Sequence, residues 1–405
     1  MEIEEAVSAI KEELASVTEC ESVELISSAG RILGEDAKAG ISVPSFPKSA
    51  MDGYAVRSED IARASSDAPV KLEVIGCLFA GDSIPSDLAG AIPSQSAVRI
   101  MTGAAVPMGY DTVVKQEDTD YGEKTVSINK SQGAYVNYCK KGEDIKEGTL
   151  VLNRGSLIGR TEAGVLASIG KSSVNVLRKL RIFVISTGSE IIDVGSKLTD
   201  SGVYNNVTYM IRASLHSGAF DVSSCIVPDD KDTIEGAIKE ALKTSDIVIT
   251  TGGVSVGARD LIPDVLSRIG AKKVFSGVNI KPGSPTIGSV AEGKAILSLS
   301  GNPYAAIANF DLYIGHIIHA LTGCSSFLPV RFTSVLRSEF SKPSNVRRLI
   351  RAHVDSDGVT ILSKNQASSV MSSYMGSNCY IDFPVGSSYA VGDEVNVIRI
   401  PEVLL

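Results

Sequence analysis

Polar turns follow five apolar segments between residues 180 and 305, and they carry the side chains most suited to chemistry. The turns are TGSE after RIFVIS, PDD after SSCIV, TGGVSVGARD after DIVIT, KPGSP after VNI and GNP after AILSLS. The carboxyl ends of parallel strands lie along one edge of a sheet, and open α/β sheets bind ligands there. If these segments are parallel strands, we expect the five turns to surround one site.

The third turn is rich in glycine and hydroxyl residues. It contains Thr251, Gly252, Gly253, Ser255 and Gly257. Glycine lets backbone N–H groups approach a ligand closely, as in phosphate-binding loops. The turn is not a Walker motif, because no GK[ST] follows it. The composition therefore favours a different kind of phosphate-binding turn.

Carboxylates stand beside these glycines. Glu190, Asp229 and Asp260 would repel a bare phosphate ester, and a bridging cation removes that repulsion. Mg²⁺ prefers oxygen ligands and typically joins one or two carboxylates to substrate phosphates. The turns therefore predict a Mg²⁺-assisted phosphate-ester site.

Each turn also has a purely structural interpretation. A glycine turn can be merely flexible, a carboxylate can cap a helix or lie in solvent at its start, and a lysine can be a surface charge. These interpretations apply to Thr251–Gly257, Glu190, Asp229, Asp230, Asp260, Lys281 and Gly301-Asn302-Pro303. No turn alone decides between the two interpretations, and only a shared edge would favour the site.

A second group of polar motifs lies nearer the N-terminus, between segments with the pattern of β-strands. It comprises SAMDGYA with Asp52, MTG with Thr102, and GED with Asp144. From residue chemistry alone, turns in a β domain explain these motifs better than a site does.

The elements that must position the turns alternate between strands and helices over residues 180–323. The strands are RIFVIS, DVSSCIV, DIVIT, VFSGVNI and AILSLS. Between them, NVTYMIRASLHSG predicts a helix, and another begins at Asp232 with Glu235 in a capping-box position. Asn302-Pro303 opens a long helix that Gly323 closes. This order predicts a doubly wound, mostly parallel sheet.

The flanking regions have other patterns. Residues 3–17 predict a helix, and TEAGVLASIG predicts a short helix closed by Gly170. Residues 55 to about 140 consist mostly of short β runs separated by Gly, Pro and Asp turns. From Pro329 onward the β pattern returns and suggests a small C-terminal barrel or sandwich.

Composition excludes several classes of protein. The chain has 405 residues, 43% hydrophobic and 21% charged, with a net charge of −8, so we expect several domains and no nucleic-acid partner. No apolar run is long enough for a membrane span, and the N-terminus lacks a signal-peptide pattern, which favours the cytoplasm. Six cysteines are scattered singly, and His316 and His319 fit a packed or solvated helix better than a metal site.

The ordered motifs resemble the molybdopterin molybdenumtransferase family, which includes the C-terminal domain of gephyrin. The resemblance covers essentially the whole chain. It runs from GRIL near Gly30 through PSFPKSAMDGYAV, IMTGAAVP, KKGEDI, ISTGSE, TTGGVSVGARD, NIKPGSP and SGNP. The SAMDGYA and TGGVSVG motifs are the specific ones, whereas GNP alone is weak.

The resemblance implies a multidomain α/β protein with four domains. A doubly wound molybdopterin-binding domain would span residues 179–326, with a discontinuous elongated linker domain at 1–45 and 141–178. A small β domain would span 46–140 and a C-terminal β barrel 327–405. It also implies a homodimer in which the N-terminal region of one chain completes the site of the other, and it admits a molybdopterin adenylyltransferase as a partner.

The implied reaction consumes adenylylated molybdopterin and molybdate, inserts molybdenum into the dithiolene and releases AMP. By motif, Glu190, Asp229 and Asp260 would serve Mg²⁺ and substrate, and Lys281 would hold an anion. Asp52, Thr102 and Asp144 would complete the site from the partner chain. The substrate-binding set would be Thr187, Gly188, Thr251, Gly252, Gly253, Ser255, Gly257, Pro282, Gly283, Gly301, Asn302 and Pro303.

The sequence departs from the family pattern at four positions. Ser189 and Asn205 stand where Asp is usual, Ser284 replaces a second Lys, and Ser300 replaces Pro. These changes leave open a tungstate-using paralogue or a non-catalytic molybdopterin-binding scaffold. A related adenylyltransferase or nucleotide amidohydrolase with the same α/β fold is a further alternative, against which the SAMDGYA region and the C-terminal β segments argue.

Overall fold

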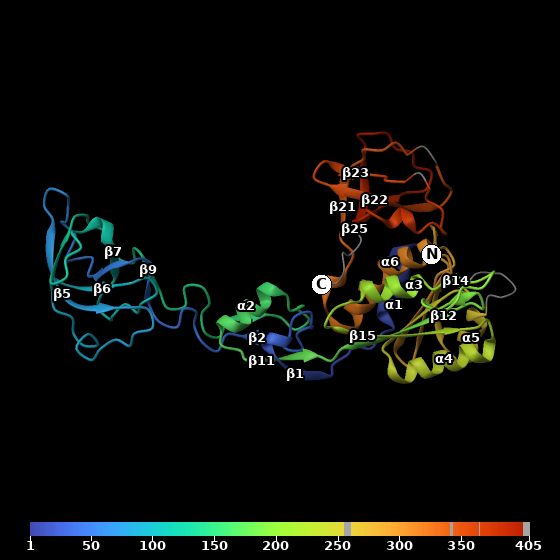
Figure 1. Cartoon of the computed structure of the whole chain (residues 1–405), viewed down its shortest axis with the longest axis horizontal. Coiled ribbons are helices and arrows are strands. Elements are labelled where there is room, and N and C mark those ends of the chain that lie inside the picture. Colours follow the sequence, from blue (N-terminus) through green and yellow to red (C-terminus); the bar gives the residue numbers. More distant parts are fainter. Residues whose placement is uncertain (255–260, 341–342, 364, 400–405) are drawn as a thin grey trace. The chain divides into compact units, whose positions relative to one another are not determined.

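The computed structural model describes residues 1–254, 261–340, 343–363 and 365–399, which divide into two structural units (Figure 1). The larger unit contains residues 1–35, 153–163 and 173–405, and the smaller contains 36–152 and 164–172. The four-domain division with the boundaries given above stays a prediction.

A six-stranded sheet organises the larger unit. Its strand order is β15-β12-β16-β20-β19-β17, and the pairs β15/β12, β12/β16 and β16/β20 are parallel. The strands are β12 (Leu180–Thr187), β15 (Phe220–Val227), β16 (Ile247–Thr251), β17 (Lys272–Ser276), β19 (Ile287–Ala291) and β20 (Lys294–Leu299). The predicted doubly wound, mostly parallel sheet is confirmed. Strand β19 was not predicted, and it runs antiparallel to both of its neighbours.

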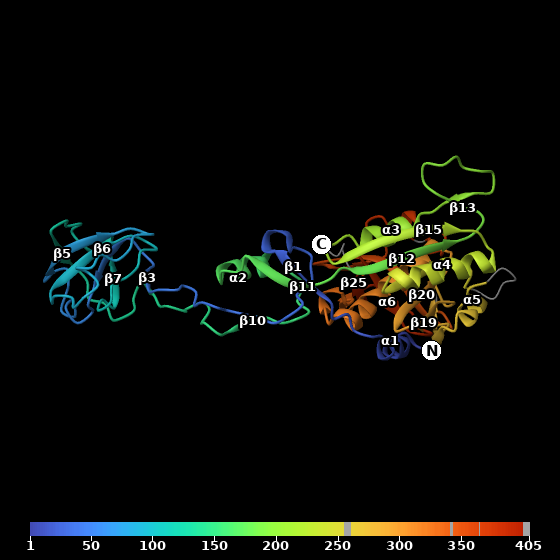
Figure 2. The same ribbon diagram turned by 90° about the horizontal axis from the view of Figure 1, so that it is seen from below.

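Helices cover both faces of this sheet (Figures 1 and 2). Apolar residues of α4 (Lys231–Thr244) and α5 (Ile262–Arg268) form one buried cluster with the sheet. Those of α1 (Ile3–Glu12), α3 (Val207–Ser214) and α6 (Pro303–Thr322) form the cluster on the other face. As predicted, Asn302 precedes Pro303 at the start of α6, and Gly323 ends the helix with φ +76°.

Three predicted helix boundaries are wrong. The helix predicted for NVTYMIRASLHSG ends as α3 at Ser214, four residues before the end of that segment. Helix α1 ends at Glu12 rather than at residue 17, and Val17 is buried beyond it, with its N–H bonded to Leu321 O at 2.7 Å. Helix α4 begins at Lys231, because the Asp230 side chain caps it by accepting the Thr233 N–H at 2.8 Å. Asp232 therefore lies in the first turn and not at the N-cap.

The segment VFSGVNI is not one strand of the central sheet, which corrects another prediction. Strand β17 ends at Ser276, and Gly277 has φ +76°, a backbone conformation that glycine adopts at low cost. The chain then enters β18 (Ile280–Lys281), which pairs in parallel with β22 of the C-terminal sheet.

The C-terminal sheet confirms the predicted return of β structure. Its order is β18-β22-β24-β25-β21, and β23 pairs with β22 beside that path. The strands are β21 (Arg331–Val335), β22 (Arg347–Asp355), β23 (Gly358–Thr360), β24 (Cys379–Phe383) and β25 (Glu394–Arg399). Short 3-10 helices lie at η3 (Ser325–Phe327) and η4 (Ser372–Tyr374).

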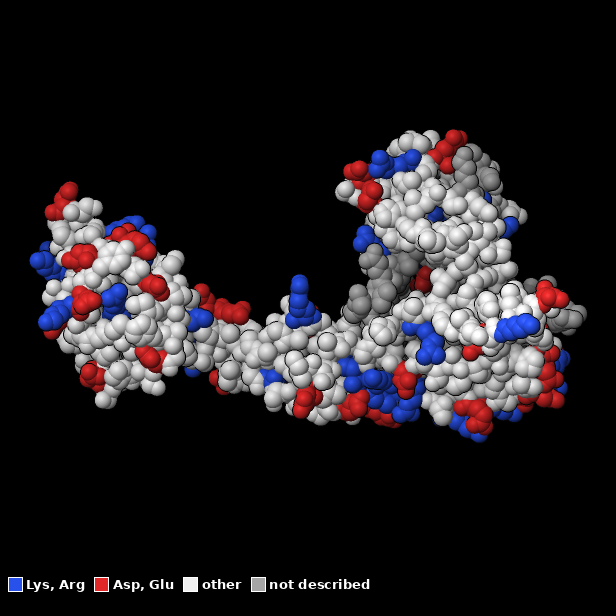
Figure 3. All heavy atoms as spheres, in the orientation of Figure 1, with Lys and Arg blue, Asp and Glu red and all other residues white. Residues whose placement is uncertain are grey.

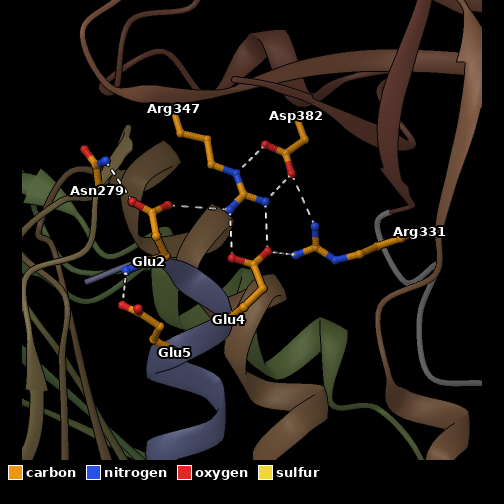
Figure 4. A network of polar contacts seen from close by, with 7 residues as sticks. All are labelled: Glu2, Glu4, Glu5, Asn279, Arg331, Arg347 and Asp382. Carbon is orange, nitrogen blue, oxygen red and sulfur yellow. Dashed lines mark hydrogen bonds and ion pairs between the residues drawn. The ribbon is translucent and has the colours of Figure 1, made fainter. Parts of the chain in front are cut away.

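An ion-pair network joins this sheet to α1 (Figure 4). Arg347 donates to both oxygens of Glu4 at 2.9 Å and, through Nε, to Asp382 at 2.7 Å. Arg331 donates to Asp382 at 3.2 Å. The hydrogen bond from Arg347 lowers the pKa of Glu4. The first turn of α1 is therefore held against the C-terminal sheet by charge-assisted bonds.

Two-stranded pairs complete the larger unit. Strand β1 (Cys20–Glu24) pairs antiparallel with β11 (Ser173–Leu177), and η1 (Leu25–Ser27) follows β1. Strands β13 (Ile191–Ile192) and β14 (Val203–Tyr204) pair in parallel at the base of a loop that Figure 2 shows extending from the sheet.

The smaller unit is mainly β, as predicted. Its five-stranded sheet has the order β7-β4-β6-β5-β8, with only β5/β6 parallel among the described pairs. Its elements are β2 (Ala37–Lys38), β3 (Lys48–Ser49), β4 (Gly53–Val56), β5 (Val70–Leu78), β6 (Ser96–Ile100), β7 (Thr112–Lys115), η2 (Gln116–Asp118), β8 (Thr125–Ile128), β9 (Tyr138–Cys139) and β10 (Leu150–Leu152). Helix α2 (Arg160–Ser168) spans residues of both units, and Gly170 follows it with φ +82°.

Charged side chains of both signs are mixed on the face drawn in Figure 3, in both units. Among the described helices, none combines the length and apolar character that crossing a membrane requires.

Candidate functional site

A cavity of about 780 Å³ opens at the carboxyl ends of the parallel strands, and we call it the edge cavity. It is lined by the turns after β12, β15, β16 and β20 and by the start of α6. Ten of the residues predicted from the sequence line it, namely Thr187, Gly188, Glu190, Asp229, Thr251, Gly252, Gly253, Gly301, Asn302 and Pro303. Four of the five predicted turns therefore meet in one cavity.

Two carboxylates stand on the wall of the edge cavity. Glu190 is exposed, and Asp229 is partly buried. Asp229 is fixed by a reciprocal pair with Ser189: its carboxylate accepts the Ser189 N–H, and its own N–H donates to Ser189 Oγ, both at 3.3 Å. The neighbouring Asp230 instead caps α4, so the two adjacent aspartates have different surroundings.

Backbone conformation keeps the glycine turn close to its neighbours. Gly252 has φ +95°, and a Cβ there would stand 2.5 Å from Thr187 O. Only glycine fits this position without strain. The turn after β16 is thus held close against the turn after β12, and the Thr187 hydroxyl joins the two by donating to Thr251 O at 3.2 Å.

A buried network of hydroxyl and amide groups supports the floor of the edge cavity. Ser186 Oγ lies 2.8 Å from Thr208 Oγ1, and it accepts from Asn205 Nδ2 at 3.1 Å and from Thr251 Oγ1 at 3.3 Å. Asn205 Oδ1 also accepts the Thr208 N–H at 3.3 Å, in the first turn of α3. Asn205 therefore links the end of β12 to the first turn of α3 beside this cavity.

Lys281 lies in a second cavity, of about 1280 Å³, between the α/β elements and the C-terminal sheet. We call it the junction cavity. Lys281, Pro282 and Gly283 line it, together with Arg348 from β22. The fifth predicted turn is therefore not part of the edge cavity, because β18 leaves the central sheet to pair with β22.

The two cavities share Ser300 and Asn302 as lining residues. Ser300 is 8% exposed, and its Oγ accepts the Asn302 N–H at 3.2 Å. The Asn302 carbonyl accepts the Ala306 N–H at 2.9 Å, which starts the hydrogen bonding of α6. The common wall of the cavities is therefore the turn that begins this helix.

Two of the three predicted residues of the smaller unit contact each other. Asp52 Oδ1 accepts both the N–H and the hydroxyl of Thr102, at 2.7 Å each. These bonds lower the pKa of Asp52 and keep its carboxylate ionised. Asp144 is exposed after β9, and its N–H donates to Val43 O at 3.0 Å.

Three predicted residues, Ser255, Gly257 and Asp260, lie outside the described residues. Within the described ranges, no group of three or more His, Cys, Asp or Glu side chains could hold a metal ion. Glu190 and Asp229 still fit Mg²⁺, since this ion typically takes one or two carboxylates together with substrate phosphate oxygens.

Sequence reasoning missed several lining residues. Arg348 belongs to β22, and only the pairing of that strand with β18 brings it to Lys281. Ser369 lines the edge cavity from a distant C-terminal segment without a recognisable motif. Asn205 and Ser300 carried a signal, because each is a polar residue two or three positions before a helix start.

Family models match three consecutive parts of the chain. Residues 1–170 match the MoeA N-terminal region (domain I and II), and residues 183–320 match a probable molybdopterin binding domain. Residues 333–400 match the MoeA C-terminal region (domain IV).

Curated relatives and solved structures agree with these matches. The chain is 35% identical over 404 residues to a molybdopterin molybdenumtransferase of Staphylococcus aureus (strain Mu50 / ATCC 700699), covering 98% of this chain and 94% of the relative. A Staphylococcus epidermidis (strain ATCC 12228 / FDA PCI 1200) relative of the same description is 36% identical over 403 residues, with the same coverage. The crystal structure of a molybdopterin biosynthesis MoeA protein from Pyrococcus horikoshii OT3 matches with a TM-score of 0.85 at 25% identity, covering 98% of this chain and 99% of that one.

Proposed function

The chain belongs to the molybdopterin molybdenumtransferase family, a family of molybdenum cofactor biosynthesis, and on that premise we propose that it inserts molybdenum from molybdate into adenylylated molybdopterin and releases AMP. The observation that carries this proposal is the convergence of four polar turns, with Glu190 and Asp229, on the edge cavity.

The edge cavity suits the phosphoanhydride of the proposed substrate. Cleavage of such a bond depends mainly on positioning and on neutralising charge. Backbone groups of the turns after β12 and β16 would face the phosphates, and Glu190 and Asp229 would hold Mg²⁺ beside them. Mg²⁺ would supply positive charge at the phosphate oxygens. Ser189 would keep the Asp229 carboxylate in place through the reciprocal hydrogen bonds.

The junction cavity suits the oxyanion. Lys281 and Arg348 bring two cationic side chains to its wall. A compact ammonium and a forked guanidinium both donate to tetrahedral oxyanions. A substrate bound across Ser300 and Asn302 would then present its dithiolene end to the oxyanion while its phosphates stay in the edge cavity.

A homodimer would complete the site. Asp52 and Thr102 form an ionised, hydrogen-bonded pair in the smaller unit. We propose that this pair, with Asp144, reaches the edge cavity of a second copy. A two-fold dimer buries the same patch on each chain and forms two equal sites.

The assay that tests the function incubates purified protein with adenylylated molybdopterin, with and without molybdate and Mg²⁺. We expect AMP release and cofactor formation only when both are present. A parallel arm with tungstate separates the two oxyanions. Binding of the substrate without turnover in any arm would instead support a non-catalytic scaffold.

Light scattering at micromolar concentration tests the dimer. We expect twice the chain mass. A monomeric mass with full activity would contradict the composite site, because Asp52 and Thr102 could then not come from a partner.

A further inference from the structure

Residues 365–370 form a short segment that contributes to both cavities. Residues 365–368 line the junction cavity, and Ser369 lines the edge cavity. The segment is bonded to the first turn of α6, where the Tyr304 N–H donates to Ser368 O at 3.0 Å. We call residues 365–370 the bridging segment. Its conformation sets part of the wall on both sides of Ser300 and Asn302.

The guanidinium group of Arg351, on β22, donates to this segment through all three of its nitrogens. Nε donates to Gln366 Oε1 at 3.3 Å, and Nη1 donates to Val370 O. Nη2 donates to the carbonyls of Asn365, at 3.5 Å, and Ala367, at 3.4 Å. Every one of these acceptors belongs to the bridging segment.

Two aromatic rings lie against the same guanidinium. Its central carbon lies 3.6 Å from the ring centroid of Tyr304 and 5.1 Å from that of Tyr374. The Tyr304 hydroxyl is itself held by Leu349 O at 2.5 Å. Arg351 therefore links the bridging segment to the residue that follows Pro303 at the start of α6.

Arg351 is 0% exposed, and within the part of the chain that the structure describes it has no carboxylate partner. Burial of a charged group is costly unless hydrogen bonds satisfy it. Here the carbonyls of the bridging segment supply those bonds. The segment cannot change its conformation without leaving a buried guanidinium unsatisfied, so charge and segment hold each other in place.

We propose that Arg351 is a positioning residue for molybdenum transfer, which holds the bridging segment so that one substrate can contact both cavities. This inference rests on the proposed function. Lysine cannot replace Arg351, because a single ammonium has neither the fork that reaches several carbonyls nor a plane that stacks on Tyr304.

Arg347 offers a matched control on the same strand. It also joins β22 to the rest of the larger unit, but through Glu4 and Asp382 and without lining either cavity (Figure 4). Arg347→Met and Arg351→Met therefore remove the same group from two anchors of one strand. Only the second should affect the bridging segment.

Hydrogen–deuterium exchange of the full chain gives a readout that does not depend on activity. We expect peptides covering residues 365–370 to exchange at least tenfold faster in Arg351→Met and Arg351→Lys than in the wild type, and unchanged in Arg347→Met. Unchanged exchange in both Arg351 variants would overturn the proposal. Gln366→Ala, which removes one acceptor only, should shift exchange in the same direction by a smaller factor, and it serves if the Arg351 variants do not fold.

Kinetics of molybdate-dependent AMP release complete the test. In Arg351→Met and Arg351→Lys we expect the KM for molybdate to rise tenfold or more, with kcat changing less. In Arg347→Met we expect the KM for molybdate to stay within twofold of the wild type, even if its Tm falls as far as the Tm of Arg351→Met. An unaltered KM in Arg351→Met, or a wild-type KM in Arg351→Lys, would overturn the positioning role. If the wild type is active in the same assay, the proposed function still holds. An inactive wild type would refute the proposed function, and the exchange result would still decide whether Arg351 holds the segment.

Discussion

The two cavities that meet at Ser300 and Asn302 differ in the charge of their walls. The edge cavity carries Glu190 and Asp229, and no Lys or Arg is among its described lining residues. The junction cavity carries Lys281 and Arg348, with one carboxylate, Glu339. Phosphate groups next to carboxylates need a cation between them, whereas an oxyanion can meet cationic side chains directly. Under the proposed function, we therefore expect the two anionic partners of the reaction to occupy different cavities, and substitutions of the wall residues test that division.

The largest effect should come from the edge cavity. Asp229→Asn removes one of its two carboxylates, and loss of a preorganised electrostatic group costs about 2.7–4 kcal/mol, or roughly a hundred- to thousandfold in kcat. The side chain lies in a turn at the cavity, so we expect Tm to change little. AMP release at saturating molybdate, over a range of Mg²⁺ concentrations, measures the effect.

The adjacent residue is the control for that change. Asp230→Asn alters the neighbouring carboxylate in the same way, but Asn caps helices about as well as Asp. Its turnover should stay within twofold of wild type. Equal loss in both variants would show that net charge near α4 matters and that Asp229 has no special place at the cavity.

A smaller effect should come from the junction cavity. A charge-assisted hydrogen bond contributes about 1.5–3 kcal/mol, so Lys281→Ala should weaken molybdate and tungstate binding roughly ten- to a hundredfold, at ~1.4 kcal/mol per decade. Lys281→Arg should rescue only in part. Lys273→Ala, at an exposed lysine on β17, should leave oxyanion affinity unchanged. Unchanged affinity in Lys281→Ala would place the oxyanion elsewhere.

A still smaller effect should follow from adding charge to the junction cavity. Ser284 is exposed on its wall, three residues from Lys281. Ser284→Lys adds a second ammonium, partly screened by solvent, and should tighten molybdate binding by about two- to fivefold, since exposed charge pairs contribute ~0.2–1 kcal/mol. High salt should reduce the gain. An equal gain in molybdate affinity in Ser189→Lys would show that the two cavities do not differ in their preference for the oxyanion.

The strand and turn pattern predicted the central sheet and the edge cavity because local periodicity determines both. Four apolar runs ended in parallel strands, and their turns therefore had to share an edge. Asp229 and Asp230 show the limit of this reasoning. Both precede the same helix, and the sequence PDDKDT offers several acids that could cap it. Only the length of β15 and the position of Thr233 decide that Asp230 caps α4 and that Asp229 faces the cavity.

The junction cavity could not be predicted, because it depends on which strands pair. Lys281 follows an apolar run, as the other turns do, but β18 pairs with a strand more than sixty residues away along the chain. Arg351 is a similar case. It lies on β22 and is fully buried, whereas arginine is almost never fully buried unless it is paired. Three of its four acceptors are backbone carbonyls, which every residue type carries, so no motif could reveal them.

Helix α6 begins directly after the shared wall of the two cavities, and it contains a buried acid that should affect neither ligand. Asp311 Oδ2 accepts a hydrogen bond from the Tyr380 hydroxyl at 2.6 Å. The Tyr380 hydroxyl also lies 2.9 Å from the Tyr374 hydroxyl. Burial raises the pKa of Asp311 to about 7. No cation among the described residues pairs with it. We expect this group to link pH to stability.

Asp311→Asn should therefore change turnover less than twofold but flatten the pH dependence of stability. The folded protein holds a proton on Asp311 that the unfolded chain, with a pKa of 3.8, has released, so the free energy of unfolding falls as pH rises from about 4 to about 7. About three pKa units at ~1.36 kcal/mol each set an upper limit of ~4 kcal/mol for this loss. Asn keeps an oxygen for the Tyr380 hydroxyl and never ionises, so the variant should be the more stable protein at pH 8 and similar to wild type at pH 5. Thermal unfolding at both pH values measures this, and a variant with the wild-type pH profile would show that Asp311 does not ionise in this range.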